Sequence, residues 1–322
     1  MRPEIISWLL EGDPSIRWQV QRDLLNSSPA KIEAERKKIT KEGWGARLLA
    51  LQNASGTWGG GIYTPKWIST TYTMLTLRLL GLPPNNPQAK RACKLFLDEG
   101  FYTDGGINFF SYSLKYSETC ITSMILALLA YFSYPDERIH SVASHLVGQQ
   151  MSDGGWNCKS YKGATHSSFH TTILALEGLY EYQCTCPEKK KQITQVRERG
   201  HEFLLAHHLY KSHHTGKIFD VKMTTMPFPP RWRYDFIRAL DYFHACDAPR
   251  DERISDAIEL LQKKQKKEGL WYVNSGMSGR KYFDLEEVGQ PSRWNTLRAL
   301  RVLNWWNEKG EARRAFRVNK SR

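Results

Sequence analysis

The 322-residue sequence has no uninterrupted apolar run of about 18 residues, the length that a membrane-spanning helix needs. Its first residues, MRPEIISWLLEGDPS, combine one arginine with a very short apolar run and then acidic residues, unlike a secretory signal peptide. The six cysteines are scattered, and only Cys184 and Cys186 stand close together. We therefore expect a cytoplasmic protein with reduced thiols and no transmembrane segment.

Signals for nucleotide binding are also missing, since neither a Gly-x-Gly-x-x-Gly segment after a strand nor a Gly-Lys-Ser/Thr loop occurs. Strand-like alternation is scarce. The net charge of +13 is concentrated in PEKKKQITQVRER near residue 190 and in the C-terminal EKGEARRAFRVNKSR. Basic runs can bind nucleic acid or anionic lipid, but we favour a solvated helix face and a frayed C-terminus as their explanation. We expect no nucleic-acid partner and leave a peripheral membrane contact open.

What the sequence does contain is an internal repeat. The stretches LLALQNASGTWGGG, HLVGQQMSDGGWNC and LLQKKQKKEGLWYV share an apolar helix end, a glutamine, a polar gap, glycine and tryptophan. Their centres are Trp58, Trp156 and Trp271, and weaker copies have Ile107 and Ile218 in place of tryptophan. The resulting period of about 50 residues, with two helices per unit, is typical of a helical repeat array.

Each glycine-rich segment lies between two kinds of helix. The preceding helices are polar on one face, and two of them begin at proline with acidic residues in the first turn, as in outer helices. The following helices have few charges, which indicates burial nearly all round. We predict six such inner helices, at 14–26, 67–80, 118–132, 166–182, 231–244 and 291–306.

The two ends of the array are expected to meet. The last inner helix ends in VLNWWNE, which is too apolar for the polar cap that an open array needs. The sequence therefore predicts an all-α protein, an (α/α)6 toroid with six inner and about six outer helices. It forms a single domain over residues 1–306, followed by a frayed basic tail at 307–322.

We interpret the Gln-Gly-Trp segments as scaffold. Glycine allows the tight turn from the outer to the inner helix, the tryptophan packs back on the helix ends, and the glutamine bonds freed backbone groups.

These segments resemble the QW repeats of squalene and terpenoid cyclases. From roughly residue 14 to residue 306, the chain is similar to the α/α-toroid superfamily, which includes protein prenyltransferase β subunits and stand-alone bacterial squalene-cyclase-like proteins. The resemblance implies a central cavity where aromatic walls hold an isoprenoid and steady carbocations. Candidate substrate-binding residues near the inner-helix starts are Trp67, Tyr72, Phe169, Trp232, Tyr234, Trp294 and Asn295. Aromatic residues at helical spacing are also typical of plain core.

The acid that would start a cyclisation is not evident. The Asp-x-Asp-Asp motif of the class II cyclases is absent, and only single acids occur, Asp104 and Asp153 in loops and Asp235 on an inner helix. We take these three as candidate proton donors, and His170 with Asp235 as a candidate acid/base pair.

A zinc site is a second hypothesis, because the related prenyltransferases use an Asp-x-Cys pair on one inner helix and a histidine on the next. Here Glu118 and Cys120 take the place of that pair, and His166 and His170 begin the next inner helix, with Cys158 between them. Thiolate, imidazole and carboxylate suit tetrahedral Zn²⁺. The alternative is that the cysteines are small buried hydrophobic residues and the histidines helix caps. The histidines 207, 208, 213 and 214 are interpreted as surface residues.

Arginine precedes tryptophan at the inner-helix starts, at Arg17, Arg231 and Arg293. Arg231 and Arg293 are candidate ligands for a diphosphate or a carboxylate, although each could instead stack on its tryptophan and pair with a loop acid. The functional hypothesis is an isoprenoid-handling enzyme that acts on a hydrophobic small molecule in a central aromatic cavity. The alternative is a non-catalytic toroid that binds a lipid or a peptide.

Overall fold

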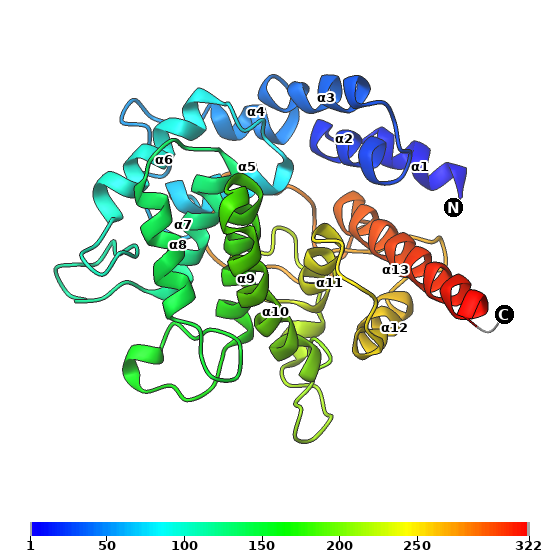
Figure 1. Ribbon diagram of the computed structural model, residues 1–322. Helices are drawn as coiled ribbons and strands as arrows, with labels where there is room; N and C mark the ends of the chain where they lie inside the picture. Colours follow the sequence, from blue (N-terminus) through cyan, green and yellow to red (C-terminus); the bar gives the residue numbers. More distant parts are fainter. Residues whose placement is uncertain (1, 321–322) are drawn as a thin grey trace.

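The computed structural model describes residues 2–320, with side chains described as far as Glu308, and its regular structure there is entirely helical (Figure 1). The all-α prediction is confirmed. Thirteen α-helices occur in these residues: α1 (Pro3–Leu10), α2 (Pro14–Asp23), α3 (Pro29–Lys37), α4 (Gly43–Leu49), α5 (Thr70–Leu80), α6 (Pro87–Gly100), α7 (Thr119–Tyr131), α8 (Arg138–Gly148), α9 (Phe169–Thr185), α10 (Lys190–Ala206), α11 (Phe236–Ala245), α12 (Ser255–Lys263) and α13 (Arg293–Lys320).

Six of these helices match the six predicted inner helices, namely α2, α5, α7, α9, α11 and α13. The clearest case is α7, where every residue from Ile121 to Ala130 is buried. The observed starts of α5, α9 and α11 come three to five residues later than predicted, at Thr70, Phe169 and Phe236. The residue before each of these helices has extended backbone geometry, and at α11 the Asp235 side chain accepts the Arg238 backbone N–H as an N-cap.

Four of the remaining helices pack against these six. The helix α6 contacts α5 and α7, α8 contacts α7 and α9, α10 contacts α9, and α12 contacts α11. The start of α6 illustrates why these outer helices form. Its N-cap Asn86 accepts hydrogen bonds from the backbone N–H groups of Gln88 and Ala89, and Pro87 occupies the first turn.

The three repeat tryptophans hold the junctions between outer and inner helices. Each is fully buried, and each indole N–H donates at 2.7 Å to the carbonyl oxygen of the leucine ten residues earlier, which lies in the last turn of the preceding helix. Each backbone N–H donates at 3.0 Å to a threonine Oγ1 in the following inner helix. The pairs are Trp58 with Leu48 and Thr70, Trp156 with Leu146 and Thr172, and Trp271 with Leu261 and Thr296.

The repeat glutamines complete these junctions. Gln52, Gln150 and Gln265 each donate from Nε2 to the carbonyl oxygen of a glycine four residues later, at 2.7–3.0 Å. The segments therefore have the scaffold role that the sequence indicated, since their polar groups satisfy backbone atoms that the helix ends leave free.

The last inner helix packs against the first helices of the chain. α13 contacts α1 and α2 as well as its neighbour α11 (Figure 1). The Arg301 guanidinium of α13 donates to Gln19 at 2.8 Å and to Asp23 at 3.0 Å, both on α2. Arg293 donates to the Trp8 carbonyl oxygen at 2.8 Å. The two ends of the chain are thus joined by direct hydrogen bonds.

The expected basic tail at 307–322 falls mostly within α13, which continues to Lys320, and its last two residues lie outside the described part. None of the helices described is long and apolar enough to cross a bilayer.

Candidate functional site

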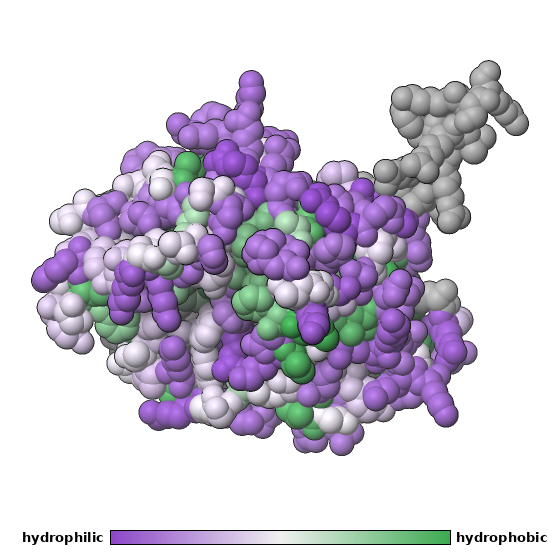
Figure 2. Space-filling model, turned by 90° about the horizontal axis from the view of Figure 1, so that it is seen from below, coloured by the Kyte–Doolittle hydropathy of each residue, from purple (hydrophilic) through white to green (hydrophobic). Residues whose placement is uncertain are grey.

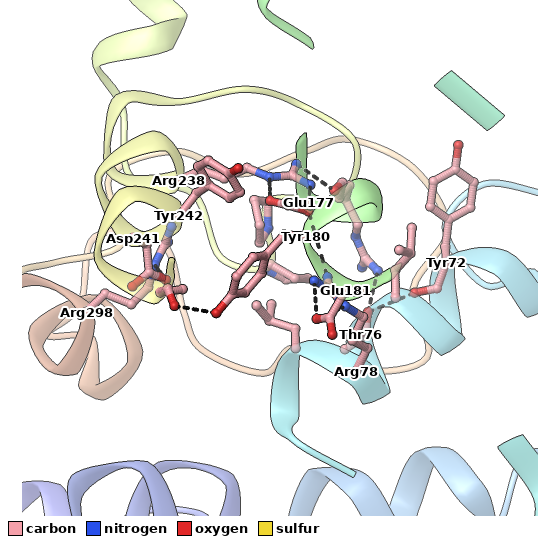
Figure 3. A pocket seen from close by; sticks show the side chains of 16 residues that line it. Tyr72, Thr76, Arg78, Glu177, Tyr180, Glu181, Arg238, Asp241, Tyr242 and Arg298 are labelled. Carbon is pink, nitrogen blue, oxygen red and sulfur yellow. Dashed lines mark hydrogen bonds and ion pairs between the residues drawn. The ribbon is translucent and has the colours of Figure 1, made fainter. Parts of the chain in front are cut away.

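A cavity of about 160 Å³ lies between α5, α9, α11 and α13, beside the segment 229–231 (Figure 3). Its lining is rich in charged side chains and tyrosines for a site between largely buried helices. Four arginines, three acids and three tyrosines contribute side chains: Arg78, Arg231, Arg238, Arg298, Glu177, Glu181, Asp241, Tyr72, Tyr180 and Tyr242.

The first half of this lining is a chain of ion pairs between three helices (Figure 3). Arg238 of α11 forms two hydrogen bonds with Glu177 of α9, at 2.7 and 2.9 Å, and Arg78 of α5 bonds to Glu181 at 2.8 Å. Burial alone would raise the pKa of Glu177, but Arg238 and Arg78 outweigh it and the pKa is lowered. Glu177 is therefore ionised and bound to cations at neutral pH.

The second half is centred on Asp241 of α11. Both of its oxygens accept from Arg301, at 2.6 Å each, and one accepts from Arg298 Nε at 3.2 Å. Burial opposes the charge of Asp241, yet Arg301 and Arg298 lower its pKa to about 2. Arg301 and Arg298 thus share one carboxylate. Because Arg301 makes the shorter bonds to it, the positive charge of Arg298 is only partly neutralised.

Two of the lining arginines have hydrogen-bonding capacity to spare. Arg298 is 2% exposed, and its Nη1 has no hydrogen-bond partner among the described residues. Arg231 forms no ion pair with any described carboxylate, and its one side-chain hydrogen bond is a long contact of 3.5 Å to Thr76 Oγ1. Burial lowers the pKa of Arg231 to about 10. Because buried donors are normally paired, Arg298 Nη1 points to an acceptor that a ligand supplies, and the half-buried Arg231 has donors left for the same acceptor.

The backbone of Arg231 has an unusual conformation beside this cavity. Its φ of +56° is in the left-handed region, which non-glycine residues adopt rarely. It follows Pro229 and Pro230, which line the same cavity, and its guanidinium lies 5.8 Å from the Trp67 ring centroid. Tyr72 packs against Trp67 at 4.9 Å, so an aromatic pair adjoins the charged lining.

Of the predicted substrate-binding residues, Tyr72 and Arg231 line this cavity, and the others lie outside its lining. Phe169 packs against Tyr234 and Phe203 in a ring cluster, Trp232 lies edge-on to His170, and Trp294 stacks on Phe228. Arg293 contacts Trp8, and the Asn295 side chain donates to the carbonyl oxygens of Met226 and Tyr272.

The two predicted loop acids hold the backbone of their loops. Asp104 accepts from the backbone N–H and hydroxyl of Ser117, both at 2.7 Å. Asp153 accepts from the same two groups of Ser167. Each acid thus fixes the entry to the next inner helix.

Asp235 and His170 have pKa values that burial shifts strongly. Asp235 is 1% exposed, its Oδ2 has no hydrogen-bond partner among the described residues, and burial raises its pKa to about 6. His170 Nδ1 accepts the Tyr234 backbone N–H at 2.8 Å, and burial together with nearby Arg238 lowers the pKa of His170 to about 4. Neither residue lines this cavity.

The predicted zinc ligands do not come together as one set. Cys120 and Cys158 interact through their thiols, near Glu118, and this interaction raises the pKa of Cys120 and lowers that of Cys158. His166 is exposed, and His170 uses Nδ1 for the Tyr234 backbone. No group of three or more histidine, cysteine or acidic residues in the described chain is arranged to hold a metal ion. The donors present therefore do not fit the four-ligand pattern of zinc.

Sequence reasoning missed most of the cavity lining. The signal was present, because Glu177 and Glu181, Arg238 and Asp241, and Arg298 and Arg301 are charges three or four residues apart on otherwise apolar helices. Charged residues at such positions are rarely buried unless they are paired. No protein-family model matches this chain, and no curated protein matches it.

Proposed function

We propose that the chain is an (α/α)6 toroid, similar in architecture to terpenoid cyclases and prenyltransferase β subunits, that binds a small organic anion in its central cavity. The contacts of α13 with α1 and α2 and the repeated tryptophan junctions support the closed array. Isoprenoid diphosphates are the anions that the resemblance suggests.

The observation that carries this proposal is that two guanidinium groups in the cavity lining have N–H donors without an acceptor. Arg298 has a buried nitrogen without a partner, and Arg231 has no carboxylate partner among the described residues. Planar guanidinium groups match the oxygens of phosphate and carboxylate. The aromatic pair Trp67 and Tyr72 beside Arg231 would contact an apolar tail attached to that anionic group.

Binding is better supported than proton-initiated chemistry. Glu177 and Asp241 have lowered pKa values and are held in ion pairs, so the lining offers no carboxylic acid from them at neutral pH. Conversion of an isoprenoid is the second candidate, and the buried Asp235 with its raised pKa is the one acid among the predicted donors that favours it, from a position outside the cavity lining. A loss of turnover in Asp235→Asn without a loss of ligand binding would support that second function.

The test is isothermal titration calorimetry of the purified protein with geranyl diphosphate, inorganic diphosphate, decanoate and uncharged geraniol. We expect binding of geranyl diphosphate, weaker binding of the other two anions, and none of geraniol. Arg231→Met and Arg298→Met should each weaken binding at least tenfold, since about 1.4 kcal/mol corresponds to a factor of ten. Arg138→Met is the matched control, because Arg138 pairs with Asp98 and Asp136 away from this cavity.

Circular dichroism spectra establish that each variant is folded. The proposal is refuted if none of the three anions binds, or if both cavity variants bind as tightly as the Arg138→Met control. Arg231→Met is the decisive variant, because Arg231 makes no ion pair with any described carboxylate that its loss would break.

A further inference from the structure

A second cavity, of about 350 Å³, lies between α10, the end of α9 and the segment 246–251 that follows α11. Pockets that take small molecules are mostly apolar, with a few polar groups that fix the orientation of the ligand. This cavity has both kinds of group. Its cationic side chains are Arg197 and Arg250, and its apolar side chains are Leu205, Phe243, Ala248 and Pro249.

Arg197 of α10 is a buried cation without a counter-ion. It is 5% exposed, and it forms no ion pair with any described carboxylate. Its Nε donates to the Tyr242 hydroxyl at 2.8 Å and its Nη1 to the Gln183 side-chain oxygen at 3.0 Å, and both acceptors are uncharged. Its Nη2 has no oxygen partner among the described residues. Because a buried charge is costly unless an opposite charge compensates it, Arg197 is prepared for an anion that a ligand supplies.

The side chains packed around Arg197 are uncharged aromatic groups. Its guanidinium lies 4.8 Å from the Tyr180 ring centroid, and the Tyr242 oxygen lies 3.0 Å from His201 Nε2. Burial, together with Arg197, lowers the pKa of His201 to about 3, so this imidazole is neutral at pH 7. Tyr180 and Tyr242 line the first cavity, the one between α5, α9, α11 and α13. They therefore lie between the first cavity and the guanidinium of Arg197, which lines the second.

Acidic residues in the same lining limit the charge of such an anion. They are Glu198, Glu202, Asp247 and Asp251. Arg253 pairs with Glu202 at 2.9 Å and with Asp251 at 2.7 Å, while Glu198 and Asp247 are exposed. Because like charges brought together cost free energy, a doubly charged phosphate is disfavoured here relative to a single carboxylate. The apolar part of the lining suits a hydrocarbon body attached to that carboxylate.

We propose that the second cavity is a separate ligand site, which takes a small monocarboxylate with an apolar body and binds its carboxylate through Arg197. A guanidinium group matches the two oxygens of a carboxylate. The apolar body would contact Leu205 and Phe243, which are 6% and 1% exposed. This inference does not rest on the anion binding proposed for the first cavity, because no residue lines both cavities.

Cys246 allows a test on the wild-type protein. It is partly exposed and lines the second cavity, whereas the exposed Cys184 lies outside that lining. The full chain is labelled with N-ethylmaleimide at increasing concentrations of 3-phenylpropanoate. After trypsin digestion, mass spectrometry follows Cys246 in the peptide 239–250 and Cys184 in the peptide 163–189. At about ten times its Kd, the carboxylate should slow the labelling of Cys246 about tenfold, because only the free protein reacts. The labelling of Cys184 should not change, and the uncharged 3-phenylpropanamide should protect neither thiol.

Variants assign the protection to Arg197. Arg197→Met should abolish it, and Arg199→Met should retain it, because Arg199 is on the same helix but bonds to Gln150 outside the cavity. Arg231→Met should also retain it, which separates this site from the first cavity.

The proposal is overturned if the carboxylate leaves the labelling rate of wild-type Cys246 unchanged at every concentration, or if the amide protects equally. It is also overturned if Arg231→Met removes the protection, since the carboxylate would then act from the first cavity. None of these results depends on Arg197→Met, so poor folding of that variant does not weaken the test.

Discussion

Arg238 of α11 and Glu177 of α9 are joined by two parallel hydrogen bonds, from Nε to Oε1 at 2.7 Å and from Nη2 to Oε2 at 2.9 Å. Arg238 also donates to the carbonyl oxygens of Arg231 and Arg233, at 3.1 and 2.8 Å. One buried pair therefore joins two inner helices and also holds the backbone of the segment that places Arg231 in the cavity.

Removal of Glu177 should be costly because it leaves Arg238 buried without its carboxylate. We expect Glu177→Ala to lower the free energy of unfolding by about 3–5 kcal/mol, measured by urea denaturation. The double variant Glu177→Leu with Arg238→Leu should recover much of that loss, since it removes both charges. Glu137→Ala serves as the control, because the Glu137 side chain is 97% exposed.

Asp241 should make the protein sensitive to strong acid. Its folded pKa of about 2 is below the ordinary value of 3.8, so its stabilising contribution is complete above pH 4 and lost as the pH falls towards 2. We expect the free energy of unfolding to fall over this interval. Asp241→Asn should be less stable at neutral pH and should show a flatter dependence on pH. An equally steep acid profile in Asp241→Asn would contradict this assignment.

Asp235 should have the opposite effect, because burial raises its folded pKa to about 6. Between pH 4 and 6 the folded state binds the proton more tightly than the unfolded state does, so raising the pH through this window costs stability. We expect the wild type to lose on the order of 2–3 kcal/mol relative to Asp235→Asn between pH 4 and 7. Asparagine is also a good N-cap, which keeps the start of α11 in place. Parallel stability profiles for the two proteins would show that Asp235 does not titrate in this window.

The tryptophan junctions can be tested with a matched pair of substitutions. Trp156→Phe leaves the buried Leu146 carbonyl oxygen without its 2.7 Å hydrogen bond, which should cost about 1–3 kcal/mol in addition to the smaller ring. Trp305→Phe is the control, because the Trp305 indole nitrogen is buried without a hydrogen-bond partner among the described residues. The prediction is that denaturant unfolding shows a greater loss for Trp156→Phe than for Trp305→Phe.

The glycine of the second junction is tested by comparison with a glycine of similar backbone geometry. Gly154 has a φ of +92°, and a Cβ there would lie 2.4 Å from the Arg199 carbonyl oxygen. Gly163 has a φ of +80°, but a Cβ there would meet nothing within 4 Å. Thermal unfolding should therefore show a substantially lower Tm for Gly154→Ala than for Gly163→Ala. Equal shifts would mean that backbone strain alone, rather than the close approach of Arg199, accounts for the glycine.

The sequence predicted the inner helices well because their signal is local. Few charges over three turns and a Gln-Gly-Trp segment before the helix were enough to place α5 and α9 within a few residues. The observed starts are later because capping requires extended backbone before the first turn, as at Asp235. Apolar pattern alone does not encode that requirement.

The cavity could not be predicted in the same way. Arg238 and Glu177 are 61 residues apart in sequence, and no spacing rule pairs charges on different helices. The aromatic residues expected to form a wall instead pack with one another, as Phe169 does with Tyr234. Whether an aromatic ring faces a cavity or a neighbouring ring depends on how the helices rotate, and the periodicity of a single helix does not fix that rotation.

The packing of α13 against α1 and α2 has a consequence for biosynthesis. A nascent chain emerges from the ribosome with α1 and α2 before α13, so the surface that α13 covers stays in contact with water until α13 has been synthesised. Residues such as Asp23 lack the Arg301 partner throughout that interval. The last contacts of α1 and α2 therefore form only after α13 has been synthesised, and until then the surface that α13 covers is exposed to non-native association.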